Sequence, residues 1–187
     1  MQAKKYKLRE DDTIVRDGRT LYRIEALREV CFDVHTGEKG GYVESEANLS
    51  QEGKSWLYDD ACAYEEARVE GDAHLKHDAT IRGKAKLFEH AILFNTVIVQ
   101  GEAIVGGWSQ LFHQVVIGGK AILKGNIFLY EKVHIGGNAY LEGTNPRELI
   151  LQGTTMIHGD TIMKGYGSFS EEDAIIEEGI FRLEGED

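Results

Sequence analysis

The hydrophobic positions in the middle of the chain recur every six residues. Written in sixes from Gly53 to Glu142, the sequence gives 15 hexads, and we expect the repeat to extend back without a break to Gly41. Position five is Leu, Ile or Val in 14 of these hexads, position three is Ala in nine, and position one is Gly in eight. A period of six gives no consistent face on an α-helix, whereas positions three and five of a strand point to the same side. Each hexad is therefore predicted to be a short strand followed by a corner.

Position one is where the chain must turn, because it holds Gly, Asp, Asn, Glu or His in every hexad. Positions three and five then fill the interior, and positions four and six point outward. Repetition of one such unit predicts an all-β solenoid of stacked parallel coils. The residues alone leave the hand of the coil open, and a right-handed coil would follow the general preference for right-handed crossovers.

The two ends of the chain depart from the hexad. In residues 1–40, Asp17-Gly18 separates the alternating stretches Thr13–Arg16 and Thr20–Ile24, which predicts a β-hairpin that caps the first coil. The repeat is assigned to residues 41–170. A loop insertion at 143–152, which contains the single proline, Pro146, interrupts it. The acidic segment 171–187 is expected to be a short C-terminal cap, either a final strand or a short helix.

The outward positions change character along the repeat. They are polar in the early hexads and largely apolar from Phe88 onward. The repeat resembles that of hexapeptide-repeat proteins, and this resemblance implies three hexads in each coil. On that arrangement one side of the solenoid gathers five apolar residues, with a tryptophan at the preceding corner: Ile92, Phe94, Phe112, Phe128, Tyr130 and Trp108. Aromatic enrichment of this kind is typical of interfaces. We expect a homo-oligomer contact, a trimer before a dimer, or a docking site for another protein. The alternative is that the C-terminal segment folds back and covers this side.

Composition narrows the range of partners. A formal net charge of −11 disfavours binding to nucleic acid or to an anionic membrane surface. No stretch approaches the roughly 18 apolar residues of a spanning helix, and the N-terminus lacks the apolar core of a secretion signal. Cys31 and Cys62 form no disulfide framework. We therefore expect both thiols to be reduced and the protein to be cytoplasmic, and no sequence motif indicates a cofactor.

The small and branched residues at positions three and five resemble those of hexapeptide-repeat proteins. That resemblance implies a left-handed β-helix of about six or more triangular, 18-residue coils. The stretch GGYVESEANLSQEGKSWLY, from Gly40 to Tyr58, more specifically resembles the YdcK-like β-helix proteins of enteric bacteria and short relatives encoded in phages and prophages. These belong to the trimeric LpxA-like superfamily, which contains acyltransferases, so the resemblance implies a transferase by fold analogy only.

Histidine is the residue through which such chemistry would act. An acyltransferase of this superfamily needs a histidine base at a groove between subunits, and His113 is the best candidate, followed by His90 and His134. The related γ-class carbonic anhydrases place histidines 36 residues apart, as His77 and His113 are here. Those enzymes also require a third histidine where this chain has Gly118, so we predict no metal site.

Three functions therefore remain in view. The favoured one is a non-catalytic β-solenoid that self-associates and binds a partner, with a phage or prophage origin implied by the resemblance. The first alternative is a hexapeptide-repeat acyltransferase that acts at a groove between subunits. The second is an acidic, phage-encoded inhibitor that presents carboxylates to a basic host protein.

Overall fold

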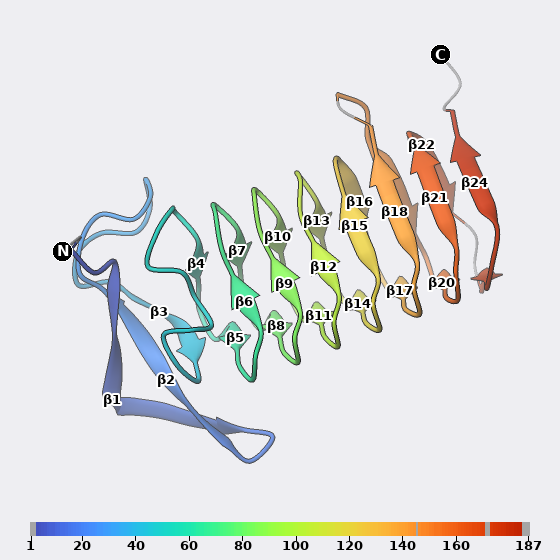
Figure 1. The fold of residues 1–187 in the computed structure, drawn as a ribbon. Helices are drawn as coiled ribbons and strands as arrows, with labels where there is room; N and C mark the ends of the chain where they lie inside the picture. Colours follow the sequence, from blue (N-terminus) through green and yellow to red (C-terminus); the bar gives the residue numbers. More distant parts are fainter. Residues whose placement is uncertain (1–2, 145, 171–172, 185–187) are drawn as a thin grey trace.

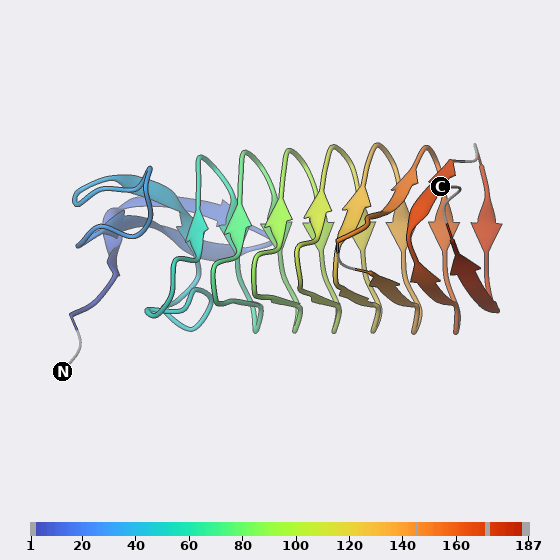
Figure 2. The ribbon, with the colours of Figure 1, turned by 90° about the horizontal axis from the view of Figure 1, so that it is seen from above.

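The chain is a β-solenoid with an antiparallel hairpin at its N-terminal end. The computed structural model describes residues 3–144, 146–170 and 173–184, and these residues form strands, turns and loops without a helix. The chain passes through three sheets in a repeating order and completes about eight turns (Figure 1). The coils lie side by side along one axis, as the view from above also shows (Figure 2).

The three sheets are named here in the order in which the chain visits them. Sheet I contains β1 (Tyr6–Arg16), β2 (Arg19–Ala26), β3 (Lys39–Val43), β5 (Cys62–Ala63), β8 (Thr80–Ile81), β11 (Ile98–Val99), β14 (Val116–Ile117), β17 (His134–Ile135), β20 (Met156–Ile157) and β23 (Ile175–Ile176). Sheet II contains β6 (Arg68–Val69), β9 (Lys86–Leu87), β12 (Ile104–Val105), β15 (Ile122–Lys124), β18 (Tyr140–Gly143), β21 (Ile162–Gly165) and β24 (Ile180–Leu183). Sheet III contains β4 (Trp56–Leu57), β7 (His74–Leu75), β10 (Ile92–Leu93), β13 (Gln110–Leu111), β16 (Ile127–Leu129), β19 (Leu149–Gln152) and β22 (Gly167–Ser170).

The strand register has a period of 18 residues. In sheet III, His74 pairs with Ile92, and Ile92 pairs with Gln110. From Trp56 up to the insertion, each residue of the repeat therefore lies beside the residue that holds the same hexad position one coil later. This register confirms that three hexads make one coil, and it places identical positions in columns along the solenoid.

Earlier in the chain the separation between paired residues is 20, since Tyr42 pairs with Cys62 and Leu49 bridges to Val69. The expectation of an unbroken repeat back to Gly41 is therefore wrong, because two added residues between Leu49 and Trp56 shift the frame.

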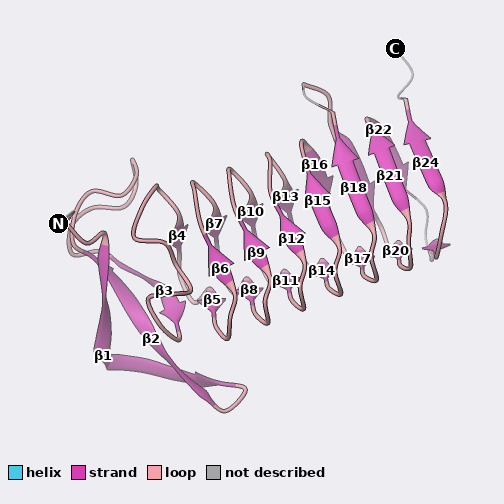
Figure 3. Cartoon of the chain, viewed as in Figure 1, coloured by secondary structure: helices cyan, strands magenta, loops and turns pink. Residues whose placement is uncertain are grey.

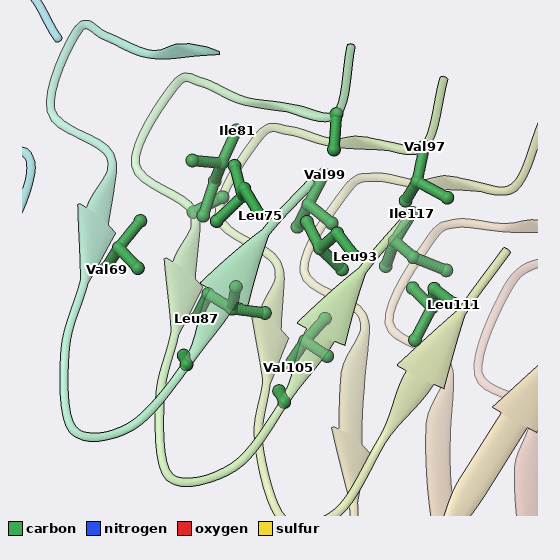
Figure 4. Packing of buried hydrophobic residues seen from close by; sticks show 14 of the residues in the cluster. Val69, Leu75, Ile81, Leu87, Leu93, Val97, Val99, Val105, Leu111 and Ile117 are labelled. Carbon is green, nitrogen blue, oxygen red and sulfur yellow. The ribbon is translucent and has the colours of Figure 1, made fainter. Parts of the chain in front are cut away.

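The interior is filled as the hexad pattern predicts. Side chains at position five, such as Leu87, Leu93 and Val99, are fully buried and point into the coil (Figure 4). The alanines at position three, including Ala85 and Ala91, are buried with them. Burying an aliphatic side chain of this size stabilises the folded state by about 1.5–3 kcal/mol. The repeated column of such residues is therefore the main source of stability.

The predicted hairpin is present and extends sheet I. β1 and β2 pair in antiparallel fashion around Asp17 and Gly18, whose φ angles of 47° and 75° fit a two-residue type I′ turn. β2 then pairs with β3, which joins the hairpin to the first coil (Figure 3). At the tip, the Asp17 carboxylate accepts hydrogen bonds from the Tyr64 hydroxyl at 2.8 Å and from Arg82 Nη1 at 2.6 Å. The hairpin therefore also covers the outer side of the early coils of sheet I.

The segment before the hairpin closes the N-terminal edge of the solenoid. Lys5 Nζ donates hydrogen bonds to the Ser55 carbonyl at 2.8 Å and to the Glu52 carbonyl at 3.3 Å, and the Tyr6 hydroxyl donates to the Leu49 carbonyl at 2.7 Å. These carbonyls belong to the first coil, which has no preceding coil to pair with. Burial lowers the pKa of Lys5 to about 8. The Tyr6 ring also packs edge-on against Trp56, at 6.3 Å between centroids, which explains why that outward-pointing residue is buried.

The insertion lengthens one turn and the coil then resumes. Phe128 in β16 pairs with Ile150 in β19, a separation of 22 residues in place of 18. The added residues lie between β18 and β19, at the corner between sheets II and III. In the segment that we expected to form a C-terminal cap, β23 and β24 pair with β20 and β21 and continue the repeat. Residues 145, 171–172 and 185–187 of the insertion and cap lie outside the described residues.

Candidate functional site

Three aromatic rings form a column on the outer side of sheet III. Phe94, Phe112 and Tyr130 all occupy position six, and the 18-residue register stacks them on consecutive coils. The rings of Phe94 and Phe112 lie 4.6 Å apart between centroids with planes 6° from parallel. Phe112 and Tyr130 lie 4.9 Å apart at 5°. These spacings match the distance between neighbouring strands, so the solenoid itself sets the stacking. We call these three residues the aromatic ladder.

A second outward row runs beside the aromatic ladder. It consists of Ile92, Gln110 and Phe128 at position four, which are in register on β10, β13 and β16. The Phe128 ring lies 6.3 Å from that of Tyr130. Six consecutive outward positions on three coils of sheet III therefore carry no charge. The sequence prediction that these apolar side chains share one side of the solenoid agrees with their placement.

The chain that follows the insertion leaves the aromatic ladder uncovered. β19 pairs with β16 and β22 pairs with β19, so both strands add to the edge of sheet III in place of packing on its outer side. Phe94, Phe112 and Tyr130 remain partly exposed. The pKa of the Tyr130 phenol is raised, mainly by burial and to a smaller extent by the negative charge of the nearby Glu148 carboxylate. Within the described residues, the alternative of a C-terminal segment folded over this side does not occur.

Polar side chains at the corner between sheets III and I, two of them histidines, accept hydrogen bonds from the backbone of the next coil. Asp59, His77, Asn95, His113 and Glu131 all hold position one with positive φ angles of 53–64°. Each of the first four side chains accepts a hydrogen bond from the backbone N–H of the next residue in the column. His113 Nδ1, for example, accepts the Glu131 N–H at 3.2 Å. These bonds stabilise a backbone conformation that non-glycine residues rarely adopt.

The structure does not bring the candidate histidines together. His113 lies on the corner between sheets III and I, His90 lies on the corner between sheets II and III, and His134 lies on β17 of sheet I. Nδ1 of His113 is already occupied by the corner hydrogen bond, which leaves Nε2 as its remaining ring nitrogen. Across the described residues, no three His, Cys, Asp or Glu side chains cluster closely enough to hold a metal ion.

Sequence reasoning missed an open cleft at the corner between sheets II and III. Its volume is about 530 Å³, and its lining includes Phe88, His90, Trp108 and Lys124. Trp108 is 54% exposed, and its ring stacks on that of His90 at 4.1 Å between centroids. Trp108 therefore lies at the corner predicted from the sequence, and its ring lines the cleft and is not part of the aromatic ladder. The signal was available in the sequence, because His90 and Trp108 are 18 residues apart.

Comparison with known proteins adds no relative. No protein-family model matches the chain, and no curated protein matches it either. The structure supports a β-solenoid, and the resemblance to YdcK-like proteins rests on the residues quoted above alone. No helix that could span a membrane occurs in the part of the chain that the structure describes.

Proposed function

We propose that the protein is a non-catalytic β-solenoid that self-associates through the outer side of sheet III. The observation that supports this most strongly is the aromatic ladder together with the uncharged row beside it. Isolated apolar side chains are common on protein surfaces, but a contiguous apolar patch is typical of an interaction site. Here the patch extends over three consecutive coils and has no cover within the described residues.

The rigidity of the patch favours binding. Its side chains stand on short strands that are hydrogen-bonded on both sides, and the stacked rings restrict one another's movement. Little side-chain entropy therefore remains to be lost when a partner covers them. Aromatic residues in such a setting are frequent energetic hot spots of interfaces.

A second copy of this chain suits the patch for two reasons. Two copies have identical strand spacing, so their rows of side chains can align or interdigitate over several coils. The chain as a whole carries a net charge of −11, which makes two copies repel each other, but the patch itself lacks charge. On these three coils of sheet III, two copies can therefore approach without bringing charged side chains together. Symmetry then favours a closed dimer or trimer.

Multi-angle light scattering after size-exclusion chromatography tests this proposal. The wild-type chain is expected to elute as a dimer or trimer, and Phe112→Asp is expected to elute as a monomer because it buries a charge in the contact. Val116→Asp is the matched control: it lies on the next strand of the same coil but points outward from sheet I, and it should assemble normally.

Circular dichroism must show that both variants keep the wild-type spectrum. A wild-type chain that is monomeric at every concentration would overturn the proposal. So would an assembly that Phe112→Asp and Val116→Asp affect equally.

A further inference from the structure

Three departures from the hexad pattern meet at the cleft between sheets II and III. Position two is polar in every hexad from Gly53 to Glu142 except at Trp108. Position six of the sheet II hexads over the same range is charged except at Phe88 and Gly106. The 18-residue register places these exceptions on neighbouring coils. A convergence of exceptions in an otherwise regular repeat indicates a local role that differs from building the solenoid.

The side chains of Phe88 and Trp108 each pack against a residue of a neighbouring coil. The Phe88 ring lies over Gly106, where an added Cβ would come within 2.4 Å of a ring carbon. The Trp108 ring stacks on His90 with the planes 22° from parallel, yet it stays more than half exposed. Gly106 thus provides the space for one ring, and His90 supports the other. Both rings are fixed before any ligand arrives, which lowers the entropic cost of binding.

The charged groups of the cleft are not equally available. The Glu89 carboxylate accepts the backbone N–H of Gly107, which fixes it at the corner. Lys124 is exposed and forms no ion pair with another described residue. Glu142, which lies beside it in the strand register, is bonded instead to Lys164 at 2.8 Å. In a chain with a strong negative charge, the cleft therefore contains a cation that is free to pair with a ligand.

We propose that this cleft binds a small planar aromatic molecule that carries an anionic group. The ring of the ligand stacks on the exposed face of Trp108 and contacts Phe88, and its anion pairs with Lys124. A cavity of about 530 Å³ lies within the usual range for small-molecule sites, roughly 300–1,000 Å³. Nucleotides and aromatic carboxylates share this chemistry. The site is complete within one chain, so it does not rest on self-association.

Isothermal titration calorimetry with four probes tests the proposal and separates the two sources. Adenosine monophosphate and 2-naphthoate carry both a ring and an anion, whereas adenosine lacks the charge and inorganic phosphate lacks the ring. We expect at least one of the first two to bind at least tenfold more tightly than adenosine and phosphate. Binding of the monophosphate alone identifies a nucleotide site, and binding of 2-naphthoate alone identifies an aromatic carboxylate site. If neither binds, the proposal fails.

Variants then locate the site, each with a matched control. Lys124→Gln should weaken the affinity for the probe at least fivefold. Lys120→Gln, which replaces an exposed lysine elsewhere on the same coil, should leave the affinity unchanged. Gly106→Ala should weaken binding by displacing the Phe88 ring, whereas Gly118→Ala, which also occupies position six, should not, because its nearest neighbour would be 3.7 Å away.

Tryptophan fluorescence gives an independent readout on the unmodified chain. The sequence has two tryptophans, Trp56, which is buried, and Trp108, which is exposed. A ligand that stacks on Trp108 should therefore quench the fluorescence of Trp108 and leave that of Trp56 unchanged. Binding that leaves the fluorescence unchanged, or that Lys124→Gln and Lys120→Gln weaken equally, would overturn the assignment.

Discussion

Two adjacent glycines should respond in opposite ways to the same substitution. Gly118 ends a hexad on sheet I, and Gly119 begins the next hexad at a corner. Gly119 has a φ angle of +63°, in the left-handed region, whereas Gly118 lies outside that region. Gly119→Ala is therefore predicted to destabilise the protein strongly, and Gly118→Ala is predicted to be neutral or slightly stabilising.

The magnitudes follow from the contacts that each new Cβ would make. At Gly119 the Cβ would lie 2.5 Å from the Gly137 carbonyl oxygen and 2.8 Å from its nitrogen, both backbone atoms of the next coil. The left-handed conformation costs an alanine about 1–2 kcal/mol, and the overlap adds about 1–3 kcal/mol. At Gly118 the nearest atom would be 3.7 Å away, so reduced freedom of the unfolded chain should stabilise the protein by about 0.4–1 kcal/mol.

Urea unfolding followed by far-ultraviolet circular dichroism measures both effects. Gly119→Ala should lower the free energy of unfolding by about 2–5 kcal/mol, which corresponds to a midpoint about 1–2 M lower for a typical urea dependence. Gly118→Ala should leave the midpoint unchanged or raise it slightly. Equal destabilisation by the two variants would refute the stacking of corners that underlies the whole solenoid. A neutral Gly119→Ala would refute it as well.

Three further predictions test the interior, the corner column and the N-terminal cap. Leu111→Ala should lower the free energy of unfolding by about 2–5 kcal/mol in urea titrations, because it leaves a cavity at a fully buried position. Asn95→Ala should cost about 1–2 kcal/mol in the same assay, because it removes the acceptor for the His113 N–H and places alanine in a left-handed conformation. The pKa of Lys5 falls from 10.5 to about 8 on folding, so at this residue the unfolded chain binds more protons between these values, and its contribution to stability should rise with pH. Burial raises the pKa of Cys31 and Cys62, which acts in the opposite direction, so the measured quantity is the difference between wild type and Lys5→Met. From pH 8 to about pH 10 the free energy of unfolding of the wild type should rise by about 2 kcal/mol relative to Lys5→Met.

The sequence predicts the solenoid because its signal is local and repeated. In each hexad the apolar residues at positions three and five indicate which side chains point inward. Because 15 hexads agree on these positions, they are all consistent with one arrangement, a solenoid of stacked coils. The hairpin is predictable for a similar reason, since Asp17-Gly18 specifies its turn without reference to distant residues. The position of the hairpin on sheet I is not predictable in this way. It depends on the bond between Asp17 and Arg82, which are 65 residues apart, and on packing that no short motif encodes.

The site was predictable to the extent that it follows the 18-residue period. The aromatic ladder emerged because Phe94, Phe112 and Tyr130 share one hexad position. The cleft did not emerge, because the repeat places Trp108 at the corner before the apolar side but does not give the direction of its ring. Its ring turns back along the solenoid onto His90, and side-chain direction of this kind is set by the space that neighbouring coils leave. The hydrogen bonds of the corner histidines were missed for the same reason.

Hydroxyl-radical footprinting at low and high protein concentration tests the proposed role of sheet III most directly, because it measures the exposure of individual side chains. If copies associate through the aromatic ladder, oxidation of Phe112 and Tyr130 should fall as the concentration rises. Oxidation of Tyr140, on the outer side of sheet II, should stay constant. Unchanged labelling of Phe112 and Tyr130 at concentrations where light scattering detects an assembly would contradict the account and place the contact elsewhere.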